Sequence, residues 1–271
     1  MTTYLGNEFY IQTADDKLDS TKLIGGKATQ LKNIDKNMVP YWVAITADCP
    51  DEVLSKVVEQ AYGNLYWQKP TASGLGDTFA VRSSAIAEDG EKQSYAGIFE
   101  SKLNVPITGI EYAVRQVRDS MYSKRVAAYG NAVTKDPTVK QHEYLGLKTA
   151  VIIMPMVDAQ ISGVLFTKEP LGGTDKMLLE YEAGVGGVVD GTGNSVTYFL
   201  DHHEFLLEDG NFFEEEVIDN ELTHTHPAQS IRPIWEEAKR LENNYRKPLD
   251  IEWAVDKNGK AWVLQVRPIT A

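Results

Sequence analysis

Apolar residues in the first half of the chain recur mostly at helical spacing. Three of them follow the glycine pair at 25–26 at intervals of three positions, as on one face of a helix. The same spacing predicts helices over 52–66 and 109–129, and the second of these is the longest amphipathic segment of the chain. Two extended segments, at 39–45 and 78–82, lie between the predicted helices.

The pattern changes after a polar connection over 131–148, which contains both Pro and Gly. Short apolar runs bounded by Gly, Pro or Asp then predict strands at 151–154, 162–167, 177–181, 196–200 and 204–207. A helix is predicted over 234–244. The last two strands, 249–255 and 260–266, are joined by an Asn-Gly step that is typical of a hairpin turn.

The length and composition fit an ordinary globular protein with room for two modest lobes. The chain has 271 residues, of which 42% are hydrophobic and 24% charged. We expect a mixed α/β fold with an N-terminal lobe over 1–147 and a C-terminal lobe over 148–271. The only cysteine, Cys49, has no second cysteine with which to form an internal disulfide.

The charge of the chain narrows the classes of partner. A formal net charge of -12 argues against a general nucleic-acid binder, because such proteins neutralise phosphates with Lys and Arg. The chain contains no apolar run of the ~20 residues needed to span a bilayer, and its start does not resemble a secretion signal. We therefore expect a cytoplasmic protein with no nucleic-acid or membrane partner, in which any polyanionic ligand meets a local basic patch.

The last predicted hairpin carries the most chemistry. By the period of two, Asp250 and Glu252 share one face of their strand, and Val263, Gln265 and Arg267 share a face of the next. If the two faces coincide, a carboxylate and an amide oxygen suit Mg²⁺, and the adjacent guanidinium suits a phosphate. The alternative interpretation of the same spacing is a surface ion pair between Glu252 and Arg267, which would contribute little to stability.

Three further segments carry weaker signals for phosphate binding. Arg82 is predicted to leave its strand into a loop of hydroxyl-bearing and small residues, which suits a polyphosphate cradle, although such serines more often cap helices and turns. The glycine-rich run 184–191 resembles a dinucleotide fingerprint, but no helix pattern follows it, so a Rossmann fold is excluded. Lys27 follows the glycine pair at a helix start, from where its side chain reaches a phosphate.

Taken together and in order, these segments resemble one family. The resemblance rests on LIGGKATQLKNI with VPYWVAIT, FAVRSSAIAEDGEKQSYAGIFESKLNV, SGVLFTKEP, and PLDIEWAV with VLQVRPIT. They are similar to the ATP-grasp nucleotide-binding domain of the phosphoenolpyruvate synthase, pyruvate phosphate dikinase and rifampicin phosphotransferase family. The resemblance extends from about residue 23 to residue 269 and implies a two-lobed ATP-grasp fold with ATP and Mg²⁺ in the cleft.

The resemblance also implies roles for individual residues. The catalytic cations that hold the nucleotide phosphates are Lys27, Arg82 and Arg267. The Mg²⁺ ligands are Glu252 and Gln265. The adenine, ribose and lid contacts fall at Met154, Met156, Val157, Glu180, Gly184 and Gly186. Such a clamp suits phosphoryl transfer, which depends on positioning and charge neutralisation.

Two departures from the family pattern affect the predicted function. The family usually carries Gln at the position of Met154, and Pro155 has no N–H to donate to a base. Dikinases of the family continue into a domain with a phosphorylatable histidine, whereas this sequence ends at Ala271. We expect phosphoryl or pyrophosphoryl transfer to a histidine on a separate partner protein. The alternatives are a free-standing small-molecule kinase or ligase and a non-catalytic nucleotide-binding regulatory module.

Overall fold

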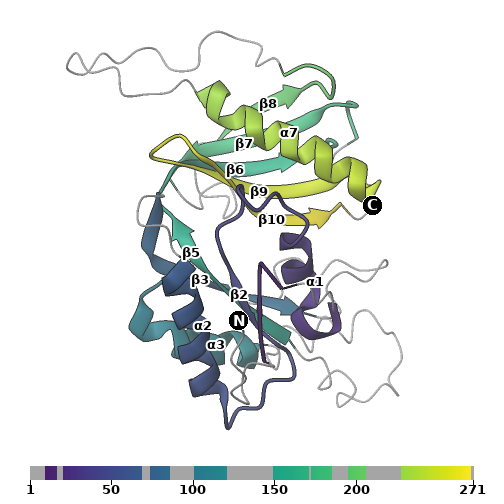
Figure 1. Cartoon of the computed structure of the whole chain (residues 1–271). Coiled ribbons are helices and arrows are strands. Elements are labelled where there is room, and N and C mark those ends of the chain that lie inside the picture. Colours follow the sequence, from purple (N-terminus) through teal and green to yellow (C-terminus); the bar gives the residue numbers. More distant parts are fainter. Residues whose placement is uncertain are drawn as a thin grey trace, which may run out of the picture.

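Two five-stranded sheets, in which all strands pair antiparallel, form the framework of the protein. In the computed structural model of the chain, one sheet lies above the other (Figure 1). The structure describes residues 10–16, 21–68, 74–85, 101–120, 149–170, 172–184, 195–205 and 227–269. This architecture confirms the expected mixed α/β fold class.

The N-terminal sheet has the strand order β1-β2-β5-β3-β4. Its strands are β1 (Ile11–Thr13), β2 (Val43–Ile45), β3 (Leu75–Ala85), β4 (Ser101–Val105) and β5 (Thr149–Val157). The helices α2 (Leu54–Gln68) and α3 (Ile110–Asp119) pack on one face, and α3 follows the 3-10 turn η2 (Ile107–Gly109). Every residue of β5 is buried, as expected for an apolar run that forms a central strand.

The C-terminal sheet has the order β10-β9-β6-β7-β8. Its strands are β6 (Ala159–Phe166), β7 (Met177–Ala183), β8 (Val196–Leu200), β9 (Leu249–Asp256) and β10 (Ala261–Pro268). The long helix α7 (Pro227–Tyr245) lies across one face of this sheet (Figure 1), where its apolar side chains join the core around Trp253. The opposite face is turned toward the N-terminal sheet.

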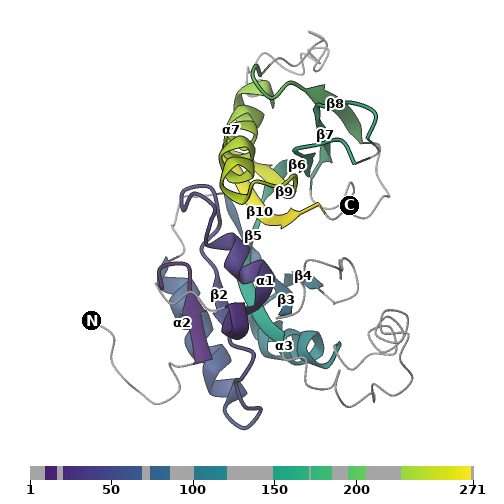
Figure 2. The ribbon, with the colours of Figure 1, turned by 90° about the vertical axis from the view of Figure 1, so that its right-hand side faces the viewer.

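Helix α1 (Thr21–Leu31) connects the two lobes. It lies beneath β10 in both views (Figures 1 and 2), and its buried side chains belong to a hydrophobic core that continues into the C-terminal sheet and α7. The chain that follows α1 is tied to the same lobe: the Val263 N–H donates to the Met38 carbonyl at 2.6 Å, and the Asp35 N–H donates to the buried carboxylate of Glu237 at 2.8 Å. Helix α1 is therefore fixed against both sheets.

Most predicted elements in the described ranges are present, but some of them differ in extent or position. The apolar run at 151–154 extends into β5, which pairs with β2 and β3, so the chain passes between sheets at Asp158 rather than at the predicted boundary of 147 and 148. The residues Glu204 and Phe205, predicted to begin a strand, are not in one. The predicted connection over 131–148 lies outside the described residues.

Candidate nucleotide site between the two sheets

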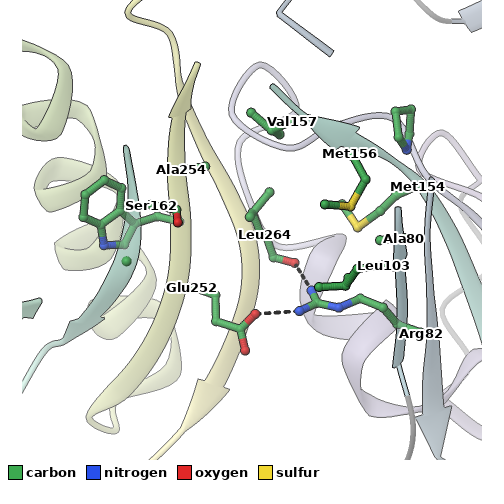
Figure 3. Close-up of a pocket in the computed structure, with 13 residues that line it drawn as sticks. Ala80, Arg82, Leu103, Met154, Met156, Val157, Ser162, Glu252, Ala254 and Leu264 are labelled. Atoms are coloured by element: carbon green, nitrogen blue, oxygen red, sulfur yellow. Dashed lines mark hydrogen bonds and ion pairs between the residues drawn. The ribbon is translucent and has the colours of Figure 1, made fainter. Parts of the chain in front are cut away.

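An apolar cavity with a charged end lies between the facing sheets (Figure 3). Strands β3, β4 and β5 line it from one side, and β6, β9 and β10 from the other. The lining residues are Ala80, Arg82, Leu103, Met154, Pro155, Met156, Val157, Ser162, Gly163, Glu252, Trp253, Ala254 and Leu264. This shape, apolar walls with a few convergent polar groups, is typical of small-molecule sites.

A β-bulge in β10 creates the polar face of the cavity. Trp253 pairs with Val263 and Glu252 pairs with Gln265, so Leu264 is an extra residue on its strand. This residue shifts the alternation of side chains by one position. Val263 consequently joins the core beside Trp253 instead of sharing a face with Gln265, which corrects the strict period of two expected from the sequence.

A second bulge, in β4, shapes the opposite wall. Phe79 pairs with Val105 and Val81 pairs with Lys102, so two residues of β4, Leu103 and Asn104, lie opposite the single residue Ala80 of β3. Asn104 has a φ of 56°, a left-handed conformation that is uncommon outside glycine. The bulge allows the side chain of Leu103, which is 46% exposed, to line the cavity from the sheet edge.

Arg82 and Glu252 join the two sheets at the charged end. The Arg82 Nη2 lies 2.6 Å from the Glu252 Oε2, and its Nη1 donates to the Leu264 carbonyl at 3.1 Å (Figure 3). Gln265 donates to the other carboxylate oxygen at 2.8 Å. Burial acts to raise the pKa of Glu252, but the charges of Arg82, Arg267 and Lys27 outweigh it and lower that pKa. Glu252 is therefore held as a carboxylate.

Asp250 is a residue of the site that the sequence did not identify as a candidate metal ligand. Its Oδ2 accepts from the Arg267 Nε at 2.6 Å, while its Oδ1 is buried without a hydrogen-bond partner. Burial raises the pKa of Asp250, Arg267 opposes the rise, and Glu252 adds to it. The sequence pattern that could have identified Asp250 is the alternation of side chains in β9, because Asp250 and Glu252 lie on the same face of that strand.

Lys27 lies in α1, and its charge acts on Glu252. A kink at Gly25, with φ 72° and ψ 176°, interrupts the helix just before it. The charge of Lys27 contributes to the lowered pKa of Glu252, so the two side chains share one electrostatic environment. Arg82 thus contacts Glu252 directly, Arg267 pairs with the neighbouring Asp250, and the charge of Lys27 acts on Glu252 from a third element.

The predicted adenine hinge forms one apolar wall of the cavity. Met154, Met156 and Val157 lie in β5 with exposed fractions of 2%, 8% and 5%, and all three line the cavity. Pro155 lies between them and pairs with Phe79 of β3. Because proline has no N–H, it offers only its carbonyl to a bound base at this point.

The predicted ribose and lid residues lie farther from the cavity. Glu180 in β7 shares a face with Glu252, since both are paired across Val164 of β6, but it is not among the cavity-lining residues of the described ranges. Gly184 directly follows β7 and has a φ of 80°, and its N–H donates to the Gln160 carbonyl at 2.8 Å. Gly186 lies outside the described residues. The ribose contact of Glu180 stays a prediction.

The fold and the site together define a two-lobed α/β protein whose cavity, between the two sheets, has Arg82 and Glu252 at its charged end. Residues 43–271 match the family described as pyruvate phosphate dikinase, AMP/ATP-binding domain. The chain belongs to this family, and the resemblance seen in the sequence is confirmed.

Curated relatives agree with the family match. The chain is 30% identical to a probable phosphoenolpyruvate synthase of Methanothermobacter thermautotrophicus, over 95% of this chain and 40% of that protein. It is 28% identical to phosphoenolpyruvate synthase of Escherichia coli, over 86% of this chain and 31% of that protein. The prodigiosin synthesizing transferase PigC of Serratia marcescens is 30% identical over 73% of this chain and 23% of its own length. The chain therefore spans less than half of each of these relatives.

The comparison with solved structures gives a weaker likeness. The D-alanine-D-alanine ligase of Helicobacter pylori matches 86% of this chain and 49% of its own, with 11% identity and a TM-score of 0.40. Among the helices that the structure describes, none is long and apolar enough to cross a bilayer. The cytoplasmic location stays a prediction.

Proposed function

We propose that this chain binds MgATP between its two sheets and passes a phosphoryl or pyrophosphoryl group from it to an acceptor. The observation that carries the proposal is an apolar cavity between the sheets with Arg82 and Glu252 at one end, beside the Arg267–Asp250 pair of the same sheet face. The base would lie against the β5 wall near Met156, with the polyphosphate at the three predicted cations. Fixed cations that meet developing negative charge are the main requirement of phosphoryl transfer.

The donor set beside these cations fits a divalent metal ion. Glu252 offers a carboxylate that is held ionised, Gln265 an amide oxygen, and Asp250 a buried oxygen with no hydrogen-bond partner. Hard oxygen donors of this kind suit Mg²⁺, which is usually held by one or two carboxylates together with substrate phosphates. When bound, the ion would supply charge neutralisation at the phosphates, while the protein's own cations orient them.

The acceptor we propose is a histidine on a separate protein. The support is that the matched region is only 40% of the Methanothermobacter phosphoenolpyruvate synthase and 31% of the Escherichia coli enzyme. In those relatives the ATP-binding domain is therefore one part of a longer protein. A small molecule that entered the cleft directly would serve as acceptor without such a partner, and the experiment below distinguishes the two.

Calorimetry of MgATP binding tests the first half of the proposal. Replacing Arg267 by glutamine should weaken MgATP binding about tenfold or more, because charge-assisted contacts to phosphate are among the strong hydrogen bonds. Arg232→Gln removes an arginine on α7 whose side chain is 62% exposed and should leave the affinity unchanged. A wild-type chain that binds no MgATP, or equal affinities of the two variants, would contradict the site.

Nucleotide analysis tests the second half. The chain is incubated with radiolabelled MgATP, either alone, with pooled small-molecule acceptors, or with a histidine-carrying domain of a phosphoenolpyruvate synthase relative. Acid-labile label on the added domain, together with release of AMP or ADP, is the expected result. Turnover with small molecules alone would favour a free-standing kinase or ligase. Binding without turnover in all three mixtures would favour a regulatory module and overturn the proposed transfer.

A further inference from the structure

Two adjacent serines in β3 occupy different environments. Ser83 and Ser84 are both 0% exposed, and they lie inside the strand, not in a loop that cradles phosphates as the sequence suggested. Their side chains alternate across the sheet. The Ser84 hydroxyl accepts a hydrogen bond from the Ala28 N–H of α1 at 3.0 Å, whereas the Ser83 hydroxyl has no hydrogen-bond partner.

Ser84 holds α1 at its kink by two independent contacts. Its hydroxyl satisfies the N–H of Ala28, one of the donors that a helix start leaves without an intrahelical partner. Its carbonyl lies so close to Gly25 that a Cβ there would be 2.0 Å from the Ser84 oxygen. Thr29 closes the turn from the other side by donating from its hydroxyl to the Gly25 carbonyl at 2.8 Å.

Lys27 lies within the stretch that these contacts fix. Gly25 precedes it and Ala28 follows it, and both touch Ser84. Arg82 precedes Ser84 by two residues on the same face of β3, so one short piece of strand sets the positions of both cations. Helix α1, which carries Lys27, and Arg82 are therefore tied to the same short piece of β3 through Ser84.

From these contacts we infer that Ser84 is a positioning residue for the triphosphate: it places Lys27 beside Arg82 without touching the nucleotide. The inference rests on the proposed function, because it concerns how the phosphates of MgATP are held. The Ser84 hydroxyl is buried and already accepts from α1. Its effect on the ligand must therefore pass through Lys27.

A double-mutant cycle on MgATP affinity tests this inference, with Kd measured by calorimetry on the full chain. Ser84→Ala should weaken MgATP binding about fivefold, and Lys27→Met about tenfold or more. In the Lys27→Met background, Ser84→Ala should have no further effect, since the residue that it positions is gone. Ser83→Ala is the matched control, and it should leave the MgATP affinity within about twofold of wild type.

A general loss of structure would give a different pattern. In that case Ser84→Ala would weaken MgATP binding by the same factor with or without Lys27, which would overturn the inference, as would a Ser84→Ala affinity equal to wild type. If Ser84→Ala fails to fold, Ser84→Cys repeats the cycle, because it keeps the side-chain volume and weakens the acceptor. If the Lys27→Met variant binds MgATP as tightly as wild type, the result contradicts the proposed phosphate site itself, and with it the role of Ser84.

Discussion

Replacing Arg82 by methionine tests whether its ion pair with Glu252 holds the two sheets together. Methionine keeps much of the buried aliphatic length and removes the guanidinium. The lost contacts are the 2.6 Å ion pair to β9 and the 3.1 Å hydrogen bond to the Leu264 carbonyl of β10. Both run between the sheets, so their loss should appear in the free energy of unfolding even when no nucleotide is bound.

The size of the effect follows from burial and from the charges that remain. The Arg82 and Glu252 side chains are 16% and 11% exposed, and breaking a fully buried pair costs about 3–5 kcal/mol. Lys27 and Arg267 still act on the carboxylate after the change. We therefore expect Arg82→Met to lower the free energy of unfolding by about 2–3 kcal/mol. Glu252→Gln should cost about 1 kcal/mol, because the amide still accepts from Arg82.

Urea unfolding at neutral pH, followed by tryptophan fluorescence, measures these differences. The double variant should lose less than the sum of the two single losses, since each single change already breaks the same pair. Arg232→Met is the control: its ion pair with Glu236 joins side chains that are 62% and 58% exposed, so it should change stability by less than about 0.5 kcal/mol. An Arg82→Met loss no larger than that of Arg232→Met, or strictly additive losses, would show that the Arg82–Glu252 pair does not hold the two sheets together.

Two further predictions concern the N-terminal lobe. Gly25→Ala should lower the free energy of unfolding by more than about 3 kcal/mol, because the added Cβ would meet the Ser84 backbone. Gly172→Ala is the control: Gly172 also has a positive φ, of 74°, but nothing lies within 4 Å of the added Cβ, so the change should cost about 1 kcal/mol. Equal urea midpoints for the two variants would contradict this. Hydrogen bonds from Ser55 and Arg115 lower the pKa of Glu111 in the folded protein. The Glu111 carboxylate therefore contributes to the free energy of unfolding above its unfolded pKa of about 4.3, and this contribution is lost as the pH falls through the lower folded pKa. The small stability difference between wild type and Glu111→Gln at pH 7 should therefore vanish in unfolding curves recorded near pH 3, and a difference that persists there would count against this ion pair.

The periodicity of the sequence predicted the elements well where a segment has one exposed and one buried face. It was less informative for β5, whose uninterrupted apolar run shows that the strand is buried but not which sheet buries it. That choice depends on pairing with β2 and β3, which are distant in sequence. The boundary between the sheets, at Asp158, could not be read from local composition for the same reason.

Two features of the site likewise could not be predicted from local sequence, because they depend on contacts between distant segments. The alternation in β9 and β10 indicated that carboxylates and cations meet, but the bulge at Leu264 leaves no clear mark in the sequence, so Val263 was placed on the wrong face. The anchoring role of Ser84 depends on α1 lying against β3, a contact between residues that are 56 positions apart. Neither feature follows from spacing alone, since both are set by how the sheets and α1 pack.

A crystal structure of the chain with Mg²⁺ and a non-hydrolysable ATP analogue would show whether the nucleotide binds between the two sheets. We expect the base between the β5 wall and Leu264, and the phosphates on Lys27, Arg82 and Arg267. The carboxylate of Glu252 should be released from its 2.6 Å ion pair to face the metal ion. A nucleotide bound outside the space between the two sheets, or one bound there with the Arg82–Glu252 pair intact and no phosphate on Arg82, would contradict the proposed nucleotide site.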